Sequence, residues 1–225
     1  ILETPTFTRL LAEDRIERVP VVEVIKRQPK AIVLAAFARM VEQAPAYIYF
    51  SFIFVYGRDI LHTSRNFLLS AVLAAAAVDL LGILIFAHIS DRIGRKRMYL
   101  IGSVATAAYA LIYFPLLNSH VPGLIFLAIT LSLVPHSMVY GPQAALIAEC
   151  FTPRLRYSGA SLGYQLASIV AGGPAPLIAT WLLFEFGSGY PIAGYIVICA
   201  LVSIVATSFL PDYTNRDISK EHDAA

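Results

Sequence analysis

Charged residues are scarce in this sequence. Lys and Arg number 17 and Asp and Glu 15 among 225 residues, whereas 58% of the chain is hydrophobic. Residues 98–148 contain no Asp, Glu, Lys or Arg. Such a run is longer than a water-soluble core helix tolerates, so the composition argues against a soluble enzyme, a disordered tail and a nucleic-acid binder. It predicts a chain that lies in a lipid bilayer.

Cysteines and catalytic motifs are also sparse. Cys150 and Cys199 lie too far apart to suggest a disulfide framework or a metal site. The sequence has no His-Glu-x-x-His, no Walker loop and no strand-linked Gly-x-Gly-x-x-Gly. Gly159-Ala160-Ser161-Leu162 matches an intramembrane serine protease motif only in part, and no later span offers a His base. We therefore expect no enzyme activity, no cofactor and no metal site.

Long apolar segments make up most of the chain. A bilayer core about 30 Å thick requires roughly 20 apolar residues in a helix. Six segments meet this length, over residues 31–56, 67–87, 98–117, 121–147, 158–184 and 190–210. The alternating strands of a membrane barrel are not seen. The predicted fold class is an all-α integral membrane protein with six transmembrane helices.

Lys and Arg are unevenly distributed between the loops. Residues 1–30 hold six, residues 88–97 four, and residues 148–157 and 211–225 two each, whereas the other loops together hold Arg58 and Arg65. By the positive-inside rule, both ends are cytoplasmic. The predicted parts are a cytoplasmic segment (1–30), a six-helix bundle (31–210) and a cytoplasmic tail (211–225). For the first segment, a docked amphipathic helix and a solvated linker both remain open.

Three ionisable residues fall inside the spans, where charge is costly. Arg39 and Glu42 lie on one face of the first span, and Asp79 lies at a similar depth on the second. One hypothesis is that Arg39 binds a substrate carboxylate while Glu42 or Asp79 carries an exchangeable proton. The alternative is a structural ion pair that only holds the helices together.

Further polar side chains in the first, fourth and fifth spans extend this candidate site. His136 could serve a proton path, and Tyr and Gln side chains could orient a small ligand, although they also occur as packing residues. Gly172, Gly173 and Pro174 predict a helix kink or gate, or else close helix packing. The candidate substrate-binding or proton-coupling residues are Arg39, Glu42, Gln43, Tyr47, Asp79, His136, Tyr140, Gln143, Tyr164 and Gln165.

The loop after the second span carries a recognisable motif. Asp91-Arg92-Ile93-Gly94-Arg95-Lys96 resembles the core of the loop signature of the major facilitator superfamily, Gly-x-Leu-Ala-Asp-Arg-x-Gly-Arg-Lys, from which the sequence differs at positions that include Ala87 and Ile89. The resemblance implies a conformational latch to the adjoining helix ends. Its residues would be Asp91, Arg92, Gly94, Arg95 and Lys96.

Three other stretches narrow the resemblance to one branch. Glu3-Thr4-Pro5-x-Phe7, residues 149–167 and Arg39-x-x-Glu42 resemble the metabolite:proton symporters, which include shikimate, 2-oxoglutarate and proline/betaine carriers. The resemblance implies the C-terminal half of a twelve-helix inner-membrane transporter, with the N-terminal six-helix half, lipid, protons and a small molecule as its partners. The first, second, fourth and fifth helices would face the cavity.

The expected function is therefore proton-coupled symport of a small metabolite by alternating access. An organic acid such as shikimate or a dicarboxylate fits Arg39, and a zwitterion such as betaine is an alternative substrate. A passive facilitator or exporter of the same fold and a non-transporting scaffold are the alternative functions.

Overall fold

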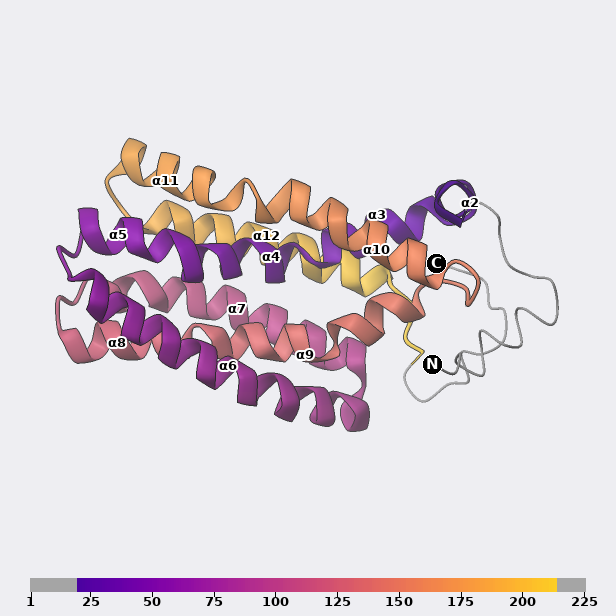
Figure 1. Ribbon diagram of the computed structural model, residues 1–225, viewed down its shortest axis with the longest axis horizontal. Coiled ribbons are helices and arrows are strands. Elements are labelled where there is room, and N and C mark those ends of the chain that lie inside the picture. The colour runs from indigo at the N-terminus through magenta and orange to yellow at the C-terminus, as the bar shows by residue number, and fades with distance from the viewer. Residues whose placement is uncertain (1–19, 214–225) are drawn as a thin grey trace.

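The computed structural model describes residues 20–213 of the chain. In this part six helices are long and apolar enough to cross a membrane, and they run side by side along the molecule (Figure 1). They are Pro29–Asp59, Arg65–Ile93, Arg95–Leu117, Pro122–Glu149, Arg156–Phe186 and Tyr190–Phe209. Residues 20–213 contain no strand, so the predicted fold class is confirmed. Most of the predicted cytoplasmic segment and tail, residues 1–19 and 214–225, lies outside the described residues.

The first, fourth and fifth spans are interrupted, whereas the other three are single helices. The first consists of α3 (Pro29–Ala38), α4 (Met40–Tyr47), the π-helix η1 (Ile48–Phe52) and α5 (Ile53–Asp59). The fourth consists of α8 (Pro122–Leu131) and α9 (Leu133–Glu149), and the fifth of α10 (Arg156–Ala167), the π-helix η2 (Ser168–Gly172) and α11 (Ala175–Phe186). The uninterrupted spans are α6 (Arg65–Ile93), α7 (Arg95–Leu117) and α12 (Tyr190–Phe209).

Prolines lie within or next to the interrupted parts of two spans. Pro45 lies inside α4, and Pro174 follows η2. A proline has no N–H for the carbonyl one turn earlier, so the helix ladder must open or shift there.

The predicted loop over residues 88–97 is almost entirely helical. α6 continues to Ile93 and α7 begins at Arg95, so Gly94 alone lies between them. The φ of Gly94 is 107°, a conformation that residues with a side chain rarely adopt. A single glycine therefore reverses the chain, and the charged side chains around it belong to helix ends rather than to a loop.

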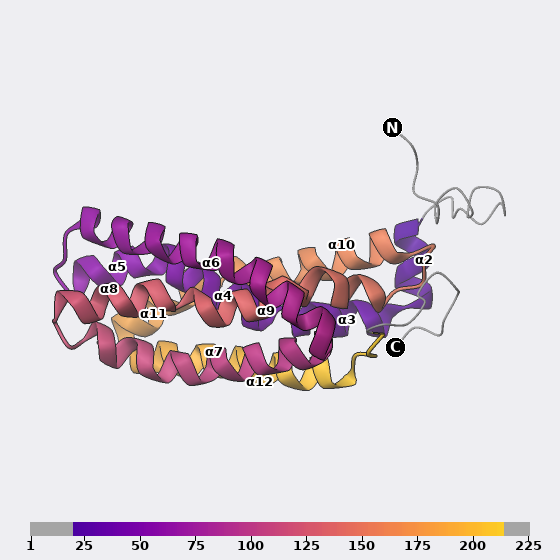
Figure 2. The same cartoon turned by 90° about the horizontal axis from the view of Figure 1, so that it is seen from below.

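The helices pack closely through small residues. α9 contacts both α6 and α7, and α7 also lies along α12 (Figure 2). A Cβ at Gly141 would lie 2.8 Å from the backbone nitrogen of Ala87 and 3.0 Å from the carbonyl oxygen of Ile83. The backbones of α9 and α6 therefore touch at this point, as small residues permit in membrane helix pairs.

We call the end of the bundle that contains Gly94 the basic end. It carries most of the arginines and lysines of the described residues, and both ends of the described chain lie there (Figure 1). Helix α2 (Pro20–Arg27) lies at this end and packs against α10. Of the two structures left open for this part of the sequence, residues 20–27 adopt the docked helix.

A hydroxyl group from α12 bridges the break in the first span. Arg39 is a turn residue between α3 and α4. The backbone N–H of Val41 donates to Ser203 Oγ at 2.8 Å, and this hydroxyl donates to the carbonyl of Phe37 at 2.9 Å. In a regular helix Val41 would donate to Phe37 directly. Because lipid offers no hydrogen bonds, the fully buried Ser203 stabilises the bend that carries Arg39.

We predict that Ser203→Ala destabilises the protein by about 1–3 kcal/mol, because it leaves a buried donor and a buried acceptor unpaired. The measurement is thermal unfolding in detergent, followed by the reaction of a maleimide dye with the buried thiols of Cys150 and Cys199. Ser208→Ala is the control, since Ser208 donates to Ile204 on an exposed part of the same helix. Equal midpoints for the two variants would contradict the bridging role.

Candidate functional site

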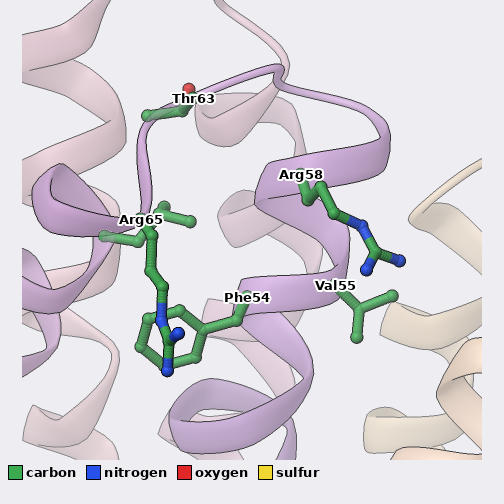
Figure 3. Close-up of a pocket in the computed structure, with 6 residues that line it drawn as sticks. Phe54, Val55, Arg58, Thr63 and Arg65 are labelled. Atoms are coloured by element: carbon green, nitrogen blue, oxygen red, sulfur yellow. The ribbon is translucent and has the colours of Figure 1, made fainter.

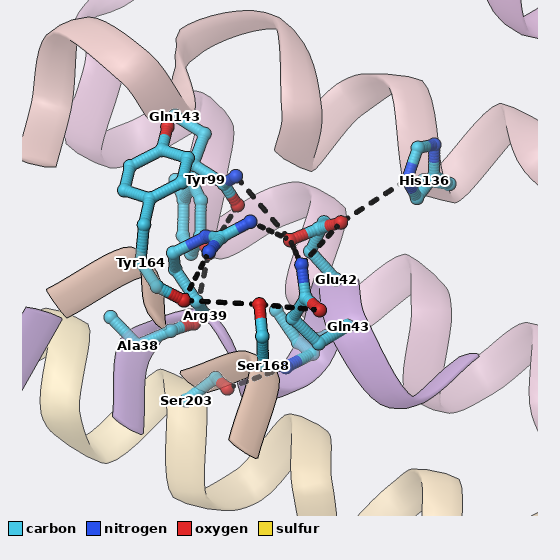
Figure 4. Close-up of polar contacts among 11 residues, drawn as sticks. Ala38, Arg39, Glu42, Gln43, Tyr99, His136, Gln143, Tyr164, Ser168 and Ser203 are labelled. Carbon is cyan, nitrogen blue, oxygen red and sulfur yellow. Dashed lines mark hydrogen bonds and ion pairs between the residues drawn. The ribbon is translucent and has the colours of Figure 1, made fainter. Parts of the chain in front are cut away.

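All six spans contribute hydrogen-bonding side chains to one cluster in the interior of the bundle. The first span supplies Arg39, Glu42 and Gln43, which form its centre (Figure 4). The other spans supply Asp79 from α6, Tyr99 from α7, His136 and Gln143 from α9, Tyr164 and Ser168 from the fifth span, and Ser203 from α12. We call these residues the central polar cluster.

Arg39 is buried, with 3% of its surface exposed, and its positive charge is balanced within the cluster. Its Nη2 donates to Glu42 Oε2 at 2.7 Å, and its Nη1 donates to the carbonyl of Tyr164 at 3.0 Å. The guanidinium carbon lies 3.7 Å from the centroid of the Tyr164 ring, a cation–π contact. Arg39 Nε is buried with no hydrogen-bond partner among the described residues. The Nε donor of Arg39 is therefore not used within the described part of the protein.

Glu42 is the hub of the cluster. Its Oε2 accepts from Gln43 Nε2 at 2.9 Å and from Gln143 Nε2 at 3.4 Å, in addition to Arg39. Its Oε1 lies 3.8 Å from His136 Nε2. The carboxylate thus contacts a cation, two amides and an imidazole, which together replace the water it has lost.

His136 lies between two carboxylates from different spans. Its Nδ1 is 3.0 Å from Asp79 Oδ1, while its Nε2 faces Glu42. Asp79 and Glu42 lie on different spans and far apart in the sequence, yet the imidazole of His136 contacts both carboxylates. With His136 protonated, the two cations of Arg39 and His136 balance the two carboxylates. The series Asp79, His136, Glu42 and Arg39 is therefore suited to holding and passing a proton.

A bend in the fifth span brings α10 and η2 against the first span. A Cβ at Gly172 would lie 2.5 Å from Gln43 Oε1 and 3.0 Å from Tyr47 Cε2. Only a residue without a side chain permits this approach. The bend places Ser168, whose hydroxyl is 3.3 Å from Gln43 Oε1, in the cluster. Gly173 is less restricted, since its nearest neighbour is the carbonyl of Ser168 at 3.5 Å.

The structure brings most of the sequence-predicted site residues together, and three lie at or beyond the edge. Tyr140 stacks on His136 with ring centroids 5.3 Å apart and is partly exposed. Tyr47 is 45% exposed beside Gly172, and Gln165 is exposed on α10. The roles of all these residues in binding and coupling stay predictions.

Three members of the cluster were missed by sequence reasoning. Ser168 follows Tyr164 by one helical turn, and this spacing could have indicated it. Tyr99 donates to the carbonyl of Ala38 at 2.8 Å and to Gln143 Oε1 at 3.2 Å. Tyr99 and Ser203 come from the helices that were expected to be peripheral, and nothing in their local sequence marks them.

The residues of the predicted latch connect helix ends at the basic end. Arg95 Nη2 lies 2.9 Å from Asp91 Oδ1 on α6, and Arg95 also pairs with Glu149 at the end of α9. Lys96 Nζ donates to the carbonyls of Ser208 and Leu210 at the end of α12, at 2.9 and 2.6 Å. Arg92 is exposed. Four helix ends thus meet around Gly94, and their proposed switching remains a prediction.

A separate cavity opens at the opposite end of the bundle (Figure 3). Its volume is about 450 Å³, and it is lined by Phe54, Val55, Arg58, Thr63, Arg65 and Leu68. Arg58 pairs with Asp59 at 2.5 Å. The cavity shares no residue with the central polar cluster. Among residues 20–213, no group of three His, Cys, Asp or Glu side chains is placed to hold a metal ion.

The chain is similar to bacterial membrane transport proteins. It is 32% identical over 198 residues to the shikimate transporter of Escherichia coli K12, a match that covers 87% of this chain and 45% of that protein. It is 27% identical over 209 residues to the inner membrane metabolite transport protein YhjE of the same strain, with 91% and 47% covered. It is 31% identical over 137 residues to that strain's proline/betaine transporter, with 61% and 27% covered.

The chain therefore spans about half the length of the first two relatives. No solved structure matches it. The family model of the Major Facilitator Superfamily matches residues 11–224, nearly the entire chain. This match, together with a bundle of six apolar helices and the Asp-Arg-x-Gly-Arg-Lys motif around Gly94, shows that the chain belongs to the major facilitator superfamily.

Proposed function

We propose that this chain is the C-terminal six-helix half of a transporter that carries a small organic acid together with protons across the cytoplasmic membrane. The observation that carries the proposal is a buried arginine linked through Glu42 and His136 to Asp79. The relatives support the substrate class, since one of them is named a shikimate transporter. The half-length match supports the assignment as one half.

Arg39 has the geometry to bind a carboxylate. A guanidinium presents parallel N–H donors that match the two oxygens of a carboxylate. In this structure Glu42 occupies Nη2, while Nε has no partner in the described chain. A substrate carboxylate would compete with Glu42 for the same cation. Glu42 thus holds the substrate position while the site is empty.

This competition supplies a mechanism of coupling. A proton bound by Glu42 cancels its charge and weakens its pair with Arg39, so Arg39 becomes free to bind the substrate anion. Asp79 and His136 would deliver the proton, because the imidazole contacts both carboxylates. Proton and anion then bind together, and the buried site never holds an unbalanced charge.

Alternating access follows from the family architecture. Two six-helix bundles rock about a site near the membrane midplane and expose it to each side in turn. The excess of basic residues at one end of the bundle supports placing that end in the cytoplasm, together with residues 1–30 and 211–225. The pairs of Arg95 with Asp91 and Glu149 would latch one conformation at that end.

Two alternative functions make different predictions. A passive facilitator or exporter would use the ion pairs only as structure, so a proton gradient would not drive accumulation. In a non-transporting scaffold, substitutions in the central polar cluster would change stability without changing flux. The satisfied hydrogen bonds of Glu42 are compatible with both, so the experiments below measure transport directly.

We predict that Arg39→Ala lowers uptake of a labelled organic acid by about 100-fold, because it removes charge-assisted hydrogen bonds of about 1.5–3 kcal/mol. The full-length protein is tested with shikimate, 2-oxoglutarate, citrate, proline and betaine under an imposed proton gradient. Arg65→Ala is the control, since Arg65 lies at the cavity of the opposite end. Near-normal uptake by Arg39→Ala at an equal membrane level would refute its anchoring role.

A second prediction concerns coupling. Glu42→Gln keeps the side-chain shape and cannot bind a proton, so we expect it to exchange substrate across the membrane but to lose gradient-driven accumulation. The measurement compares counterflow with net accumulation in proteoliposomes, with Asp79→Asn as the parallel variant. If accumulation persists in Glu42→Gln, Glu42 is not the proton carrier. If the unmodified protein equilibrates substrate regardless of the gradient, the facilitator is the correct function.

A further inference from the structure

Helix α2 lies across the end of the bundle rather than along it. In Figure 1 α2 is seen end-on while the spans run horizontally, and in Figure 2 it is seen from the side, running across them. The two views agree that its axis runs across the direction of the spans. When the spans cross a membrane, α2 therefore lies parallel to the membrane surface.

The position of α2 is fixed by contacts with the bundle. Val24 is completely buried and belongs to an apolar cluster with Ala31, Phe151 and Leu155. Next to α2, Gln28 Nε2 donates to Thr152 Oγ1 at 3.3 Å. Pro29 then begins the first span one residue after Gln28. The helix is thus joined rigidly both to the fifth span and to the span that carries Arg39.

The remaining surface of α2 separates apolar from charged side chains. Val21, Val22 and Ile25 are 46%, 46% and 51% exposed, and their spacing places them within about 100° of one another around the helix. Glu23 and Arg27 form an ion pair on the opposite side. A solvated helix would gain nothing from three exposed aliphatic side chains on one side, whereas this division is typical of a helix at a membrane interface.

Charge at this end identifies the kind of lipid. Lys26 near the end of α2 and Lys30 in the first turn of α3 are both exposed. Other exposed basic residues of the same end include Arg92 and Arg97. Basic side chains beside an interfacial helix attract anionic headgroups.

We propose that α2 is an interfacial helix that binds an anionic lipid surface. Val21, Val22 and Ile25 insert at the boundary between headgroups and acyl chains, while Lys26 and Lys30 contact lipid phosphates. The apolar side of α2 is then continuous with the lipid-facing surface of the bundle. Because α2 leads directly into the first span, the lipid fixes the height at which this span, and with it Arg39, begins.

Spin labelling of the full-length protein in vesicles tests the proposal. Ile25→Cys and Arg27→Cys place a nitroxide on opposite sides of α2. The two positions are similarly exposed, since Ile25 is 51% exposed and the side chain of Arg27 is 53% exposed. The thiols of Cys150 and Cys199 are buried, and the unsubstituted protein controls for their labelling. Collision with oxygen reports contact with acyl chains, and collision with a water-soluble nickel chelate reports contact with water.

We expect the label at position 25 to favour oxygen and the label at position 27 to favour the nickel chelate. About a quarter of the phosphatidylcholine is then replaced with phosphatidylglycerol. Each of the two lysines should increase the ratio of membrane-inserted to uninserted α2 about fivefold. The nitroxide at position 25 should therefore lie deeper, on average, in the anionic membrane. Lys26→Gln combined with Lys30→Gln, introduced with the Ile25 label, should remove this lipid effect.

Three results would overturn the proposal. Free access of nickel chelate to both labels would place α2 in water. Shielding of the label at position 25 from both reagents would show that protein, such as another part of the transporter, covers this side. Insertion that is the same in both lipid mixtures would refute the role of the two lysines in binding anionic headgroups.

Discussion

The burial of Arg39 and Glu42 in a lipid-embedded bundle is the constraint on which the rest of the structure depends. Neither charge can be hydrated there, so each must be balanced by protein groups. Glu42 draws in Gln43, Gln143 and His136, and His136 in turn contacts Asp79. The helices that provide these partners must reach the first span at one depth, and this requirement fixes how they pack.

The bends of the first and fifth spans serve the same constraint. Arg39 lies where the first span breaks, and the fifth span approaches Gln43 only because Gly172 has no side chain. If the fifth span were a regular helix with a side chain at position 172, that side chain would hold the span away from Gln43. Interrupted helices have a cost in lost backbone hydrogen bonds, and the cluster offsets part of it by supplying side-chain partners such as Ser203.

The fold and the charged centre of the site follow from the sequence to a large extent. Six spans are evident because lipid imposes a minimum apolar length, and Arg39, Glu42 and Asp79 stand out because charge in a span is costly. Which way the other polar residues point is less predictable. When a span is apolar on all sides, its sequence does not show which side faces the interior of the bundle. Tyr47 and Gln165 were therefore grouped with the site, although both are exposed. Tyr99 and Ser203 act through packing between distant segments, which local sequence does not encode.

The Ser203 hydroxyl of α12, which bonds to two backbone groups of the first span, limits how these two helices can move relative to each other. A helix held to its neighbour by side-chain packing alone can slide by small steps, since one packed arrangement replaces another of similar energy. α12 cannot slide along the first span in this way, because any axial shift would pull Ser203 out of the gap between Phe37 and Val41. α12 and the adjoining part of the first span must therefore translate and rotate as one rigid body.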